Sequence, residues 1–221
     1  MAAAPDDAGL TVAYARPCDV RRRLGLGALD ETERARAARI SNRARHDHFI
    51  AGRALLRHCL SAAAGNAVRP ACWQFMNGAC GKPSVKPGLP QIRFSISHAE
   101  GLVAVAASSV SKIGIDLELV TGAQDTRPAP DQLTRRERAW LREHSEADRW
   151  LAFLQLWTAK EAVSKATGLG CSVDFRDIEI DVPAGRARCP DGLLASGDRV
   201  DFDLQTIQAH GATYCLSVAR I

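Results

Sequence analysis

Two stretches of the chain repeat one pattern, in which an alternating strand is followed by a histidine-containing turn and then by an apolar strand. The stretches are residues 92–108 (IRFSISHAEGLVAVAAS) and 200–220 (VDFDLQTIQAHGATYCLSVAR). Apolar residues at every second position predict strands with one buried face, and a short turn between two such strands predicts a hairpin. The repeat favours an α+β fold of two similar halves, which we expect to span residues 1–111 and 112–221.

Helix and strand signals fill the rest of each half. We expect a strand over 10–15, and then a helical stretch that begins near Asp30 and runs to about Ala64, where Gly65 ends it. Residues 79–91 are rich in Gly and Pro and are expected to be mostly loop. The second half has a capping box at 134–137 and a long helix over 146–167 capped by Ser145. Its expected strands are 113–119, 177–182, 199–207 and 212–219.

Composition limits the class of protein. With 46% hydrophobic and 24% charged residues, the chain has the make-up of a soluble globular protein. No apolar run approaches the roughly 18 residues that suggest a membrane span, and residues 1–10 lack the basic start and apolar core of a secretory signal. We therefore expect a cytoplasmic protein without a membrane partner. The seven cysteines are scattered singly, which argues against a zinc site or a disulfide framework.

Arginines crowd the first 57 residues. A basic field of this kind favours an anionic partner. Nucleic acid is one such partner, but the stretch lacks interleaved aromatic residues and matches no nucleic-acid-binding module in its spacing. A solvated helix face explains most of these charges.

Three carboxylates and a lysine lie in residues 114–118 (GIDLE) and 157–165 (WTAKEAVSK). In a strand, Asp116 and Glu118 point to the same face, and on a helix, Glu161 and Lys165 lie one above the other. Three carboxylates without His or Cys suit a hard cation such as Mg²⁺, which completes its shell with water and substrate phosphates. The same spacing also fits an exposed acid pair on a strand and an ordinary helical Glu–Lys pair.

Four motifs occur together and in order: 80–83 (CGKP), 94–98 (FSISH), 114–118 (GIDLE) and 157–162 (WTAKEA), the last followed by Lys165 and Gly168. Over roughly residues 34–175 this arrangement resembles the surfactin-synthetase-type (group II) 4′-phosphopantetheinyl transferases. The resemblance implies their pseudo-dimeric α+β fold and their activity, holo-[acyl-carrier-protein] synthesis. In that reaction the 4′-phosphopantetheine of coenzyme A passes to a serine of an apo acyl or peptidyl carrier protein, and adenosine 3′,5′-bisphosphate is released. We expect a monomer.

The resemblance also implies roles for individual residues. Asp116, Glu118 and Glu161 match the metal-binding acids, and Glu161 is the candidate base for the incoming serine hydroxyl. Lys165 would stabilise negative oxygens in the transition state. The candidate coenzyme A contacts are Ser97 and His98, expected at the tip of the first hairpin, with Lys82, Arg53 and, in a supporting role, Lys160. Trp157 is expected to be a packing anchor.

Departures from the family pattern put one coenzyme A contact in doubt. Many relatives carry an arginine before the aromatic residue of R-F-x-x-G-R, whereas this chain reads HFIAGR over 48–53. His48 therefore stands where an arginine is common, and Arg53 matches the later arginine. Ala99 after His98 supplies no metal ligand, and Ser95 stands where Asn is common, a change that we do not interpret.

Two other classes of function fit parts of the sequence. A catalytically idle module that binds coenzyme A or a carrier domain would keep His98 and the basic residues without needing both Asp116 and Glu161. An Mg²⁺-dependent nucleic-acid enzyme would use the same acids with the arginines as a backbone clamp. It lacks stacking aromatics, which make up only 5% of the chain, so we expect no nucleic-acid partner.

Overall fold

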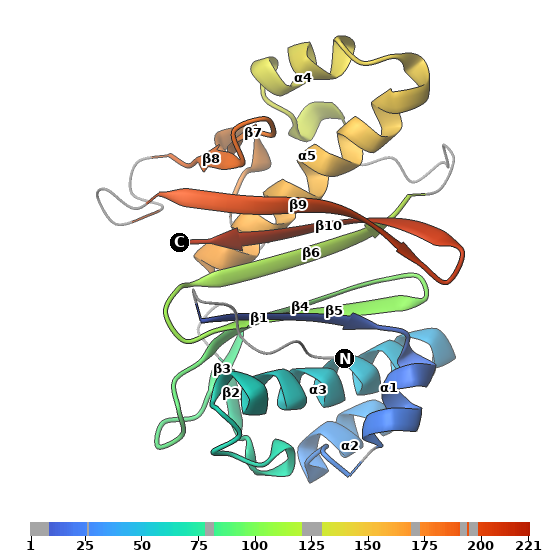
Figure 1. Ribbon diagram of the computed structural model, residues 1–221, viewed down its shortest axis with the longest axis vertical. Coiled ribbons are helices and arrows are strands. Elements are labelled where there is room, and N and C mark those ends of the chain that lie inside the picture. Colours follow the sequence, from blue (N-terminus) through green and yellow to red (C-terminus); the bar gives the residue numbers. More distant parts are fainter. Residues whose placement is uncertain are drawn as a thin grey trace. The chain divides into compact units, whose positions relative to one another are not determined.

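The structure, a computed structural model, describes residues 9–25, 27–77, 82–120, 130–168, 173–190, 194 and 199–221. The chain divides into two compact units, Met1–Lys112 and Ile113–Ile221 (Figure 1). Each unit combines helices with antiparallel strands, so the expected α+β class is confirmed. That the two units are separate domains stays a prediction.

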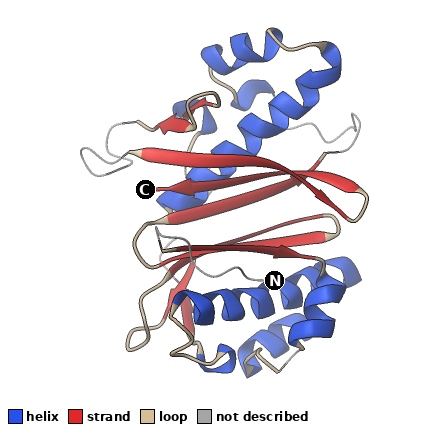
Figure 2. Ribbon diagram, in the orientation of Figure 1, coloured by secondary structure: helices blue, strands red, loops and turns tan. Residues whose placement is uncertain are grey.

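The first unit is a three-stranded antiparallel sheet with helices packed on it (Figure 2). The strands lie in the order β1-β5-β4, and α3 contacts all three of them. A hydrophobic core fills the space between α3 and the sheet. The elements are β1 (Leu10–Ala15), α1 (Pro17–Leu24), α2 (Glu31–Ala38), α3 (Arg43–Ala63), η1 (Pro70–Cys72), β2 (Phe75–Asn77), β3 (Pro83–Val85), β4 (Arg93–Ala99) and β5 (Leu102–Ser108).

The second unit is a five-stranded antiparallel sheet with the long helix α5 packed on β6 and β10. Its strands lie in the order β6-β10-β9-β8-β7. The elements are β6 (Ile113–Leu119), η2 (Pro130–Gln132), α4 (Arg135–Arg142), α5 (Glu146–Thr167), η4 (Phe175–Asp177), β7 (Glu179–Asp181), β8 (Arg186–Arg188), β9 (Val200–Ala209) and β10 (Ala212–Arg220).

The repeated sequence pattern corresponds to the hairpins β4–β5 and β9–β10. In each unit, the first strand of the unit pairs with the second strand of the hairpin, which gives β1-β5-β4 and β6-β10-β9. The two units therefore share a topology: a strand, then helices, then a hairpin. Ser97 and His98 do not lie at the hairpin tip as expected, because they pair within the ladder with Ala104 and Val103.

Local capping explains where the helices begin and end. The Ser145 hydroxyl accepts the backbone N–H of Asp148 at the start of α5, and Gly168 ends the helix in the left-handed conformation, as expected. The capping box between Thr134 and Glu137 is also present at α4. Among the helices that the structure describes, none combines the length and apolar character needed to cross a membrane.

One expectation for the first unit is wrong in detail. The single helical stretch from Asp30 is two helices, because the side chain of Asn42 accepts the N–H of Arg45 and begins a new helix at α3. The described part of the Gly- and Pro-rich segment is mostly loop as expected, apart from the short strand β3, which pairs with β2. Residues 79–81 of that segment lie outside the described residues.

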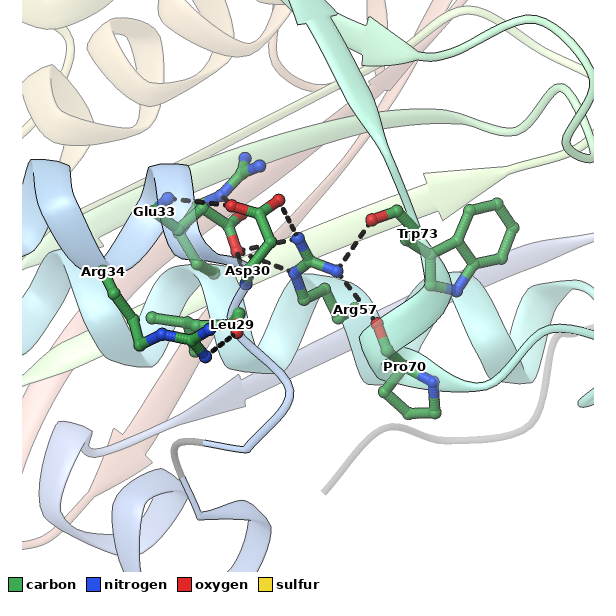
Figure 3. Close-up of polar contacts among 8 residues, drawn as sticks. Leu29, Asp30, Glu33, Arg34, Arg57, Pro70 and Trp73 are labelled. Carbon is green, nitrogen blue, oxygen red and sulfur yellow. Dashed lines mark hydrogen bonds and ion pairs between the residues drawn. The ribbon is translucent and has the colours of Figure 1, made fainter.

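The arginines of the first half are not all on a solvated face. Arg57 is fully buried on α3, where it donates to Asp30 Oδ2 at 2.6 Å and to Glu33 Oε2 at 2.8 Å. Its Nη1 donates to the backbone carbonyls of Trp73 at 2.8 Å and Pro70 at 3.1 Å (Figure 3). A buried charge of this kind persists only when it is paired. Arg57 therefore ties the N-terminal end of α2 and the segment before β2 to α3.

Candidate active site

The strand β6 presents Gly114, Asp116 and Glu118 on the face that α5 covers. Strand alternation places these three residues on one side. A Cβ atom at Gly114 would lie only 1.9 Å from the carbonyl oxygen of Ala162 and 2.6 Å from the amide nitrogen of Ala166, both in the backbone of α5. Only glycine permits so close an approach, so Gly114 sets the distance between the helix and the acids of β6.

Lys165 on α5 joins the acids of β6 directly. Its Nζ donates to Asp116 Oδ1 at 2.6 Å and to the carbonyl oxygen of Ile115 at 3.2 Å. The Asp116 side chain is buried, whereas that of Lys165 keeps partial access to solvent. The lysine thus anchors the last turns of α5 to β6 and places a positive charge beside the carboxylates.

The other two acids, Glu118 and Glu161, have raised pKa values, so they keep their protons more readily than free carboxyl groups do. Burial raises the pKa of Glu118 to about 7, and the charge of Asp116 adds to this effect. Burial and the charge of Asp116 also raise the pKa of Glu161, while the charge of Lys165 lowers it. The three acids therefore repel one another, and the positive charge of Lys165 offsets this repulsion only in part. Such arrangements are common where carboxyl groups act on substrates or hold cations.

Trp157 does more than pack. Its side chain hydrogen-bonds Glu118, which lowers the pKa of that carboxyl group. The indole N–H is the only donor a tryptophan side chain has. The ring is fixed by its neighbours, since its centroid lies 6.4 Å from that of Phe153 in a stacked arrangement and 5.2 Å from that of Phe175, edge to face. Trp157 therefore orients Glu118 from a rigid position.

Strand β10 completes this face with small residues. Ser217 lies directly opposite Asp116, and Cys215 lies opposite Glu118. The Cys215 sulfur contacts the Thr158 hydroxyl of α5 at 3.3 Å. Ser217 is fully buried, and its Oγ has no hydrogen-bond partner among the described residues. An unpaired polar atom therefore lies beside the acid cluster.

The chemistry of these groups fits a hard cation. The side chains offer only oxygen donors, their charges repel one another, and the Ser217 hydroxyl has no partner among the described residues. Within the same described residues, no three His, Cys, Asp or Glu side chains form a ready-made metal cage. Mg²⁺ usually needs only one or two carboxylates besides water and substrate phosphates, so these residues suit it as a donor set.

Lys160 does not face this site, and its assignment as a coenzyme A contact is corrected. Its side chain is fully buried, and its Nζ lies 2.8 Å from Glu137 Oε2, which is equally buried. The same Nζ also donates to the carbonyl oxygens of Phe175 and Ile178. Glu137 in turn caps α4 and accepts the N–H of Ile180. Lys160 therefore joins α5 to α4 and to the segment before β7.

In the first unit, His98 lies beside His48. Ser97 is buried near the end of β4 and His98 is exposed. The ring centroids of His98 and His48 are 5.4 Å apart. His48 Nδ1 lies 2.8 Å from the carbonyl oxygen of Ala44, so that nitrogen carries the proton, and the buried Nε2 has no partner among the described residues. His48, which stands where an arginine is common in relatives, thus lies beside His98, one of the predicted phosphate contacts.

The two remaining candidates of the first unit have different surroundings. Arg53 forms an ion pair with Glu33, and its guanidinium lies 4.2 Å from the centre of the Phe75 ring. Burial lowers the pKa of Arg53, although the charge of Glu33 opposes this. Lys82 is half-buried directly before β3. Cys80 and Gly81, the start of its motif, lie outside the described residues.

The structure thus gathers Asp116, Glu118, Glu161 and Lys165 in the second unit. Two polar neighbours of this cluster were not predicted as site residues. These neighbours are Trp157 and Ser217. Trp157 lies four residues before Glu161, on the same row of the helix, so its contact with the cluster could have been inferred from the sequence. Ser217 lies in an apolar strand, and no sequence pattern indicates its place beside the acids.

The comparisons with known proteins agree with this arrangement. Residues 112–219 match the family model described as the 4′-phosphopantetheinyl transferase superfamily. The 4′-phosphopantetheinyl transferase HetI of Nostoc sp. is 32% identical over 155 residues, which are 69% of this chain and 64% of HetI. The 4′-phosphopantetheinyl transferase pptA of Paxillus involutus is 32% identical over 53% of this chain and 50% of its own length. AcpT of Escherichia coli K12, also named a 4′-phosphopantetheinyl transferase, is 29% identical over 56% of this chain and 59% of its own length.

The chain therefore spans between half and two thirds of the length of these curated relatives. The matched residues 112–219 include β6, α5 and all of β10 except Arg220, and with them every side chain of the acid cluster. This part of the chain is therefore similar to the 4′-phosphopantetheinyl transferase superfamily.

Proposed function

We propose that the protein transfers the 4′-phosphopantetheine moiety of coenzyme A to a serine of an apo acyl or peptidyl carrier protein and releases adenosine 3′,5′-bisphosphate. The observation that carries this proposal is the 2.6 Å contact between Lys165 and Asp116 beside Glu118 and Glu161, within the segment that matches the superfamily. The proposed enzyme is of the surfactin-synthetase type and acts as a cytoplasmic monomer without nucleic-acid or membrane partners.

Asp116, Glu118 and Glu161 are the proposed ligands of Mg²⁺. When bound, Mg²⁺ would polarise the pyrophosphate of coenzyme A and neutralise charge on the departing phosphate. The mutual repulsion of the three acids supports this assignment, since a divalent cation relieves it.

Two side chains then act on the reacting groups. The serine oxygen of the carrier bonds to the β-phosphorus, and the bond from that phosphorus to the oxygen of the leaving adenosine bisphosphate breaks. Glu161 accepts the serine proton, a role that its raised pKa suits. Lys165 stabilises the negative oxygens that develop around the phosphorus.

Contacts to the phosphates of coenzyme A come, in this proposal, from the first unit. Ser97 and His98 are the main candidates, with Lys82 and Arg53 in support. The proximity of His48 to His98 makes His48 a further candidate in place of the arginine common in relatives. Lys160 is not among these contacts, because its ammonium is buried and paired.

The carrier is expected to be acidic around its modified serine. Exposed arginines near the end of α1, namely Arg21, Arg22 and Arg23, would steer its approach.

The test is to incubate the protein with Mg²⁺, coenzyme A and a panel of apo acyl and peptidyl carriers, and to measure the intact mass of each carrier. The proposal expects the mass of one phosphopantetheine to be added, and expects the addition to vanish with chelator and with Glu161→Gln. Glu146→Gln, an exposed glutamate at the start of the same helix, is the matched control. No addition to any carrier would refute the transferase and leave a binding module, whereas cleavage of DNA or RNA would favour the nucleic-acid enzyme.

A further inference from the structure

Ser217 is a buried polar residue that the proposed mechanism does not use. It is 0% exposed, and its Oγ makes no hydrogen bond to any described residue. On β10 it lies directly opposite Asp116 of β6. Residues directly opposite each other in an antiparallel pair point to the same face and lie close together. The hydroxyl therefore belongs to the face that carries the acids.

Helix α5 closes this face over Ser217. On one side of Ser217 along β10, Cys215 contacts Thr158 of α5. On the other side, Ala219 lies opposite Gly114, whose Cα is packed against the backbone of α5 at Ala162. A small residue is therefore required at this position of β10, but a hydroxyl is not required for packing.

A buried hydroxyl without a partner destabilises the folded protein, because it has lost its hydrogen bonds to water. Alanine would meet the need for small size without that cost, as it does at position 219. A serine here is explained if the hydroxyl gains a partner in the working protein. The acids that face the same side are the proposed holders of a hydrated cation, and Mg²⁺ keeps several of its water ligands.

We propose that Ser217 is a positioning residue of the cation site, whose Oγ accepts a hydrogen bond from a water ligand of the cation held by Asp116, Glu118 and Glu161. This inference rests on the proposed function, because it needs that cation. Loss of an outer partner that orients the ligands of a metal typically weakens metal binding by about 10- to 100-fold.

The test measures binding of Mn²⁺, as a stand-in for Mg²⁺, to the full chain by titration calorimetry, together with the melting temperature of the cation-free protein. We expect Ser217→Ala to weaken Mn²⁺ binding about tenfold, in the range found for outer partners of metal ligands. The melting temperature of cation-free Ser217→Ala should equal or exceed that of the wild type, because an unpaired hydroxyl is removed.

Trp150→Phe is the matched control. The Trp150 Nε1 is likewise buried without a partner among the described residues, and it lies eleven residues before Glu161 on α5. This variant should bind Mn²⁺ as the wild type does.

Wild-type affinity in Ser217→Ala would overturn the inference while leaving the proposed function intact. A lowered melting temperature of the cation-free alanine variant would show that the hydroxyl has a purely structural role, and it would overturn the inference as well. A wild-type protein that bound no Mn²⁺ would overturn the inference together with the proposed cation site.

Discussion

The Nζ of Lys165 lies 2.6 Å from Oδ1 of Asp116, which joins α5 to β6 through a partly exposed lysine side chain and a buried carboxylate. This pair predicts that Lys165→Gln lowers kcat by about 100-fold, as the loss of one transition-state donor commonly does. The KM for coenzyme A should change less. Steady-state kinetics on a carrier substrate measure both constants, and an unchanged kcat would show that the lysine only supports the fold.

Gly114 predicts a stability effect with a clear control. Gly114→Ala places a Cβ against the backbone of α5, and overpacking of this kind costs roughly 1–3 kcal/mol in unfolding free energy, or more when backbone must move. Activity should fall with it, because Lys165 and Glu161 move away from β6. Gly27→Ala, with no atom within 4 Å of the added Cβ, should leave both unchanged. Denaturant unfolding of the two variants checks this prediction, which fails if they are equally stable.

The raised pKa of Glu118 predicts how stability depends on pH. Because its pKa rises from 4.5 to about 7 on folding, the folded state binds its proton more tightly than the unfolded state does. This contribution to stability is complete below about pH 4.5 and is lost as the pH rises through 7. The melting temperature of the cation-free protein should therefore decrease as the pH is raised from about 4.5 to above 7. The decrease should be smaller in Glu118→Gln.

Bound Mg²⁺ should counteract the loss of stability that accompanies a rise in pH. A cation binds the ionised carboxylate, so its stabilising effect should be larger at pH 8 than at pH 5.5. Equal shifts of the melting temperature by Mg²⁺ at both pH values would count against Glu118 as a ligand.

The hydrogen bond of Trp157 predicts an effect on the pKa of Glu118 that can be distinguished from an effect on packing. Trp157→Phe keeps an aromatic ring beside Phe153 and Phe175 but removes the indole N–H. The pKa of Glu118 should rise further, because the hydrogen bond that lowers it is gone. Mn²⁺ binding at pH 7 should therefore weaken and should recover at pH 8.5. A loss that persists unchanged at high pH would point to displaced packing instead.

Lys160 predicts a loss of stability without a catalytic role. In Lys160→Met, the buried carboxylate of Glu137 loses its charged partner, and breaking a buried ion pair from one side typically costs about 3–5 kcal/mol. At a temperature where the variant is folded, its kcat and its KM for coenzyme A should match those of the wild type. A raised KM in folded protein would restore Lys160 to the proposed coenzyme A contacts.

The second unit was predictable where its signals are local. The alternation of apolar residues predicts β6. Ser145 and Gly168, which flank α5, predict where that helix begins and ends. The acids of β6 and Glu161 of α5 could likewise be assigned to single faces from strand and helix periodicity alone.

Features that depend on distant partners could not be predicted in this way. Arg57 and Lys160 look like surface charges in sequence, but they are buried because Glu33 and Glu137 reach them from other elements. The split between α2 and α3 depends on the Asn42 side chain, which caps a new helix within a run of polar and charged residues. The position of Ser217 follows from strand register, which the sequence of β10 alone does not reveal.

The most direct test of the proposed function measures adenosine 3′,5′-bisphosphate and modified carrier in the same reaction, with Mg²⁺ and then with chelator. The proposed transfer predicts one bisphosphate for each phosphopantetheine gained by the carrier, and neither product with chelator or in Glu161→Gln. Release of bisphosphate without modification of the carrier, or modification that continues without a divalent cation, would contradict it.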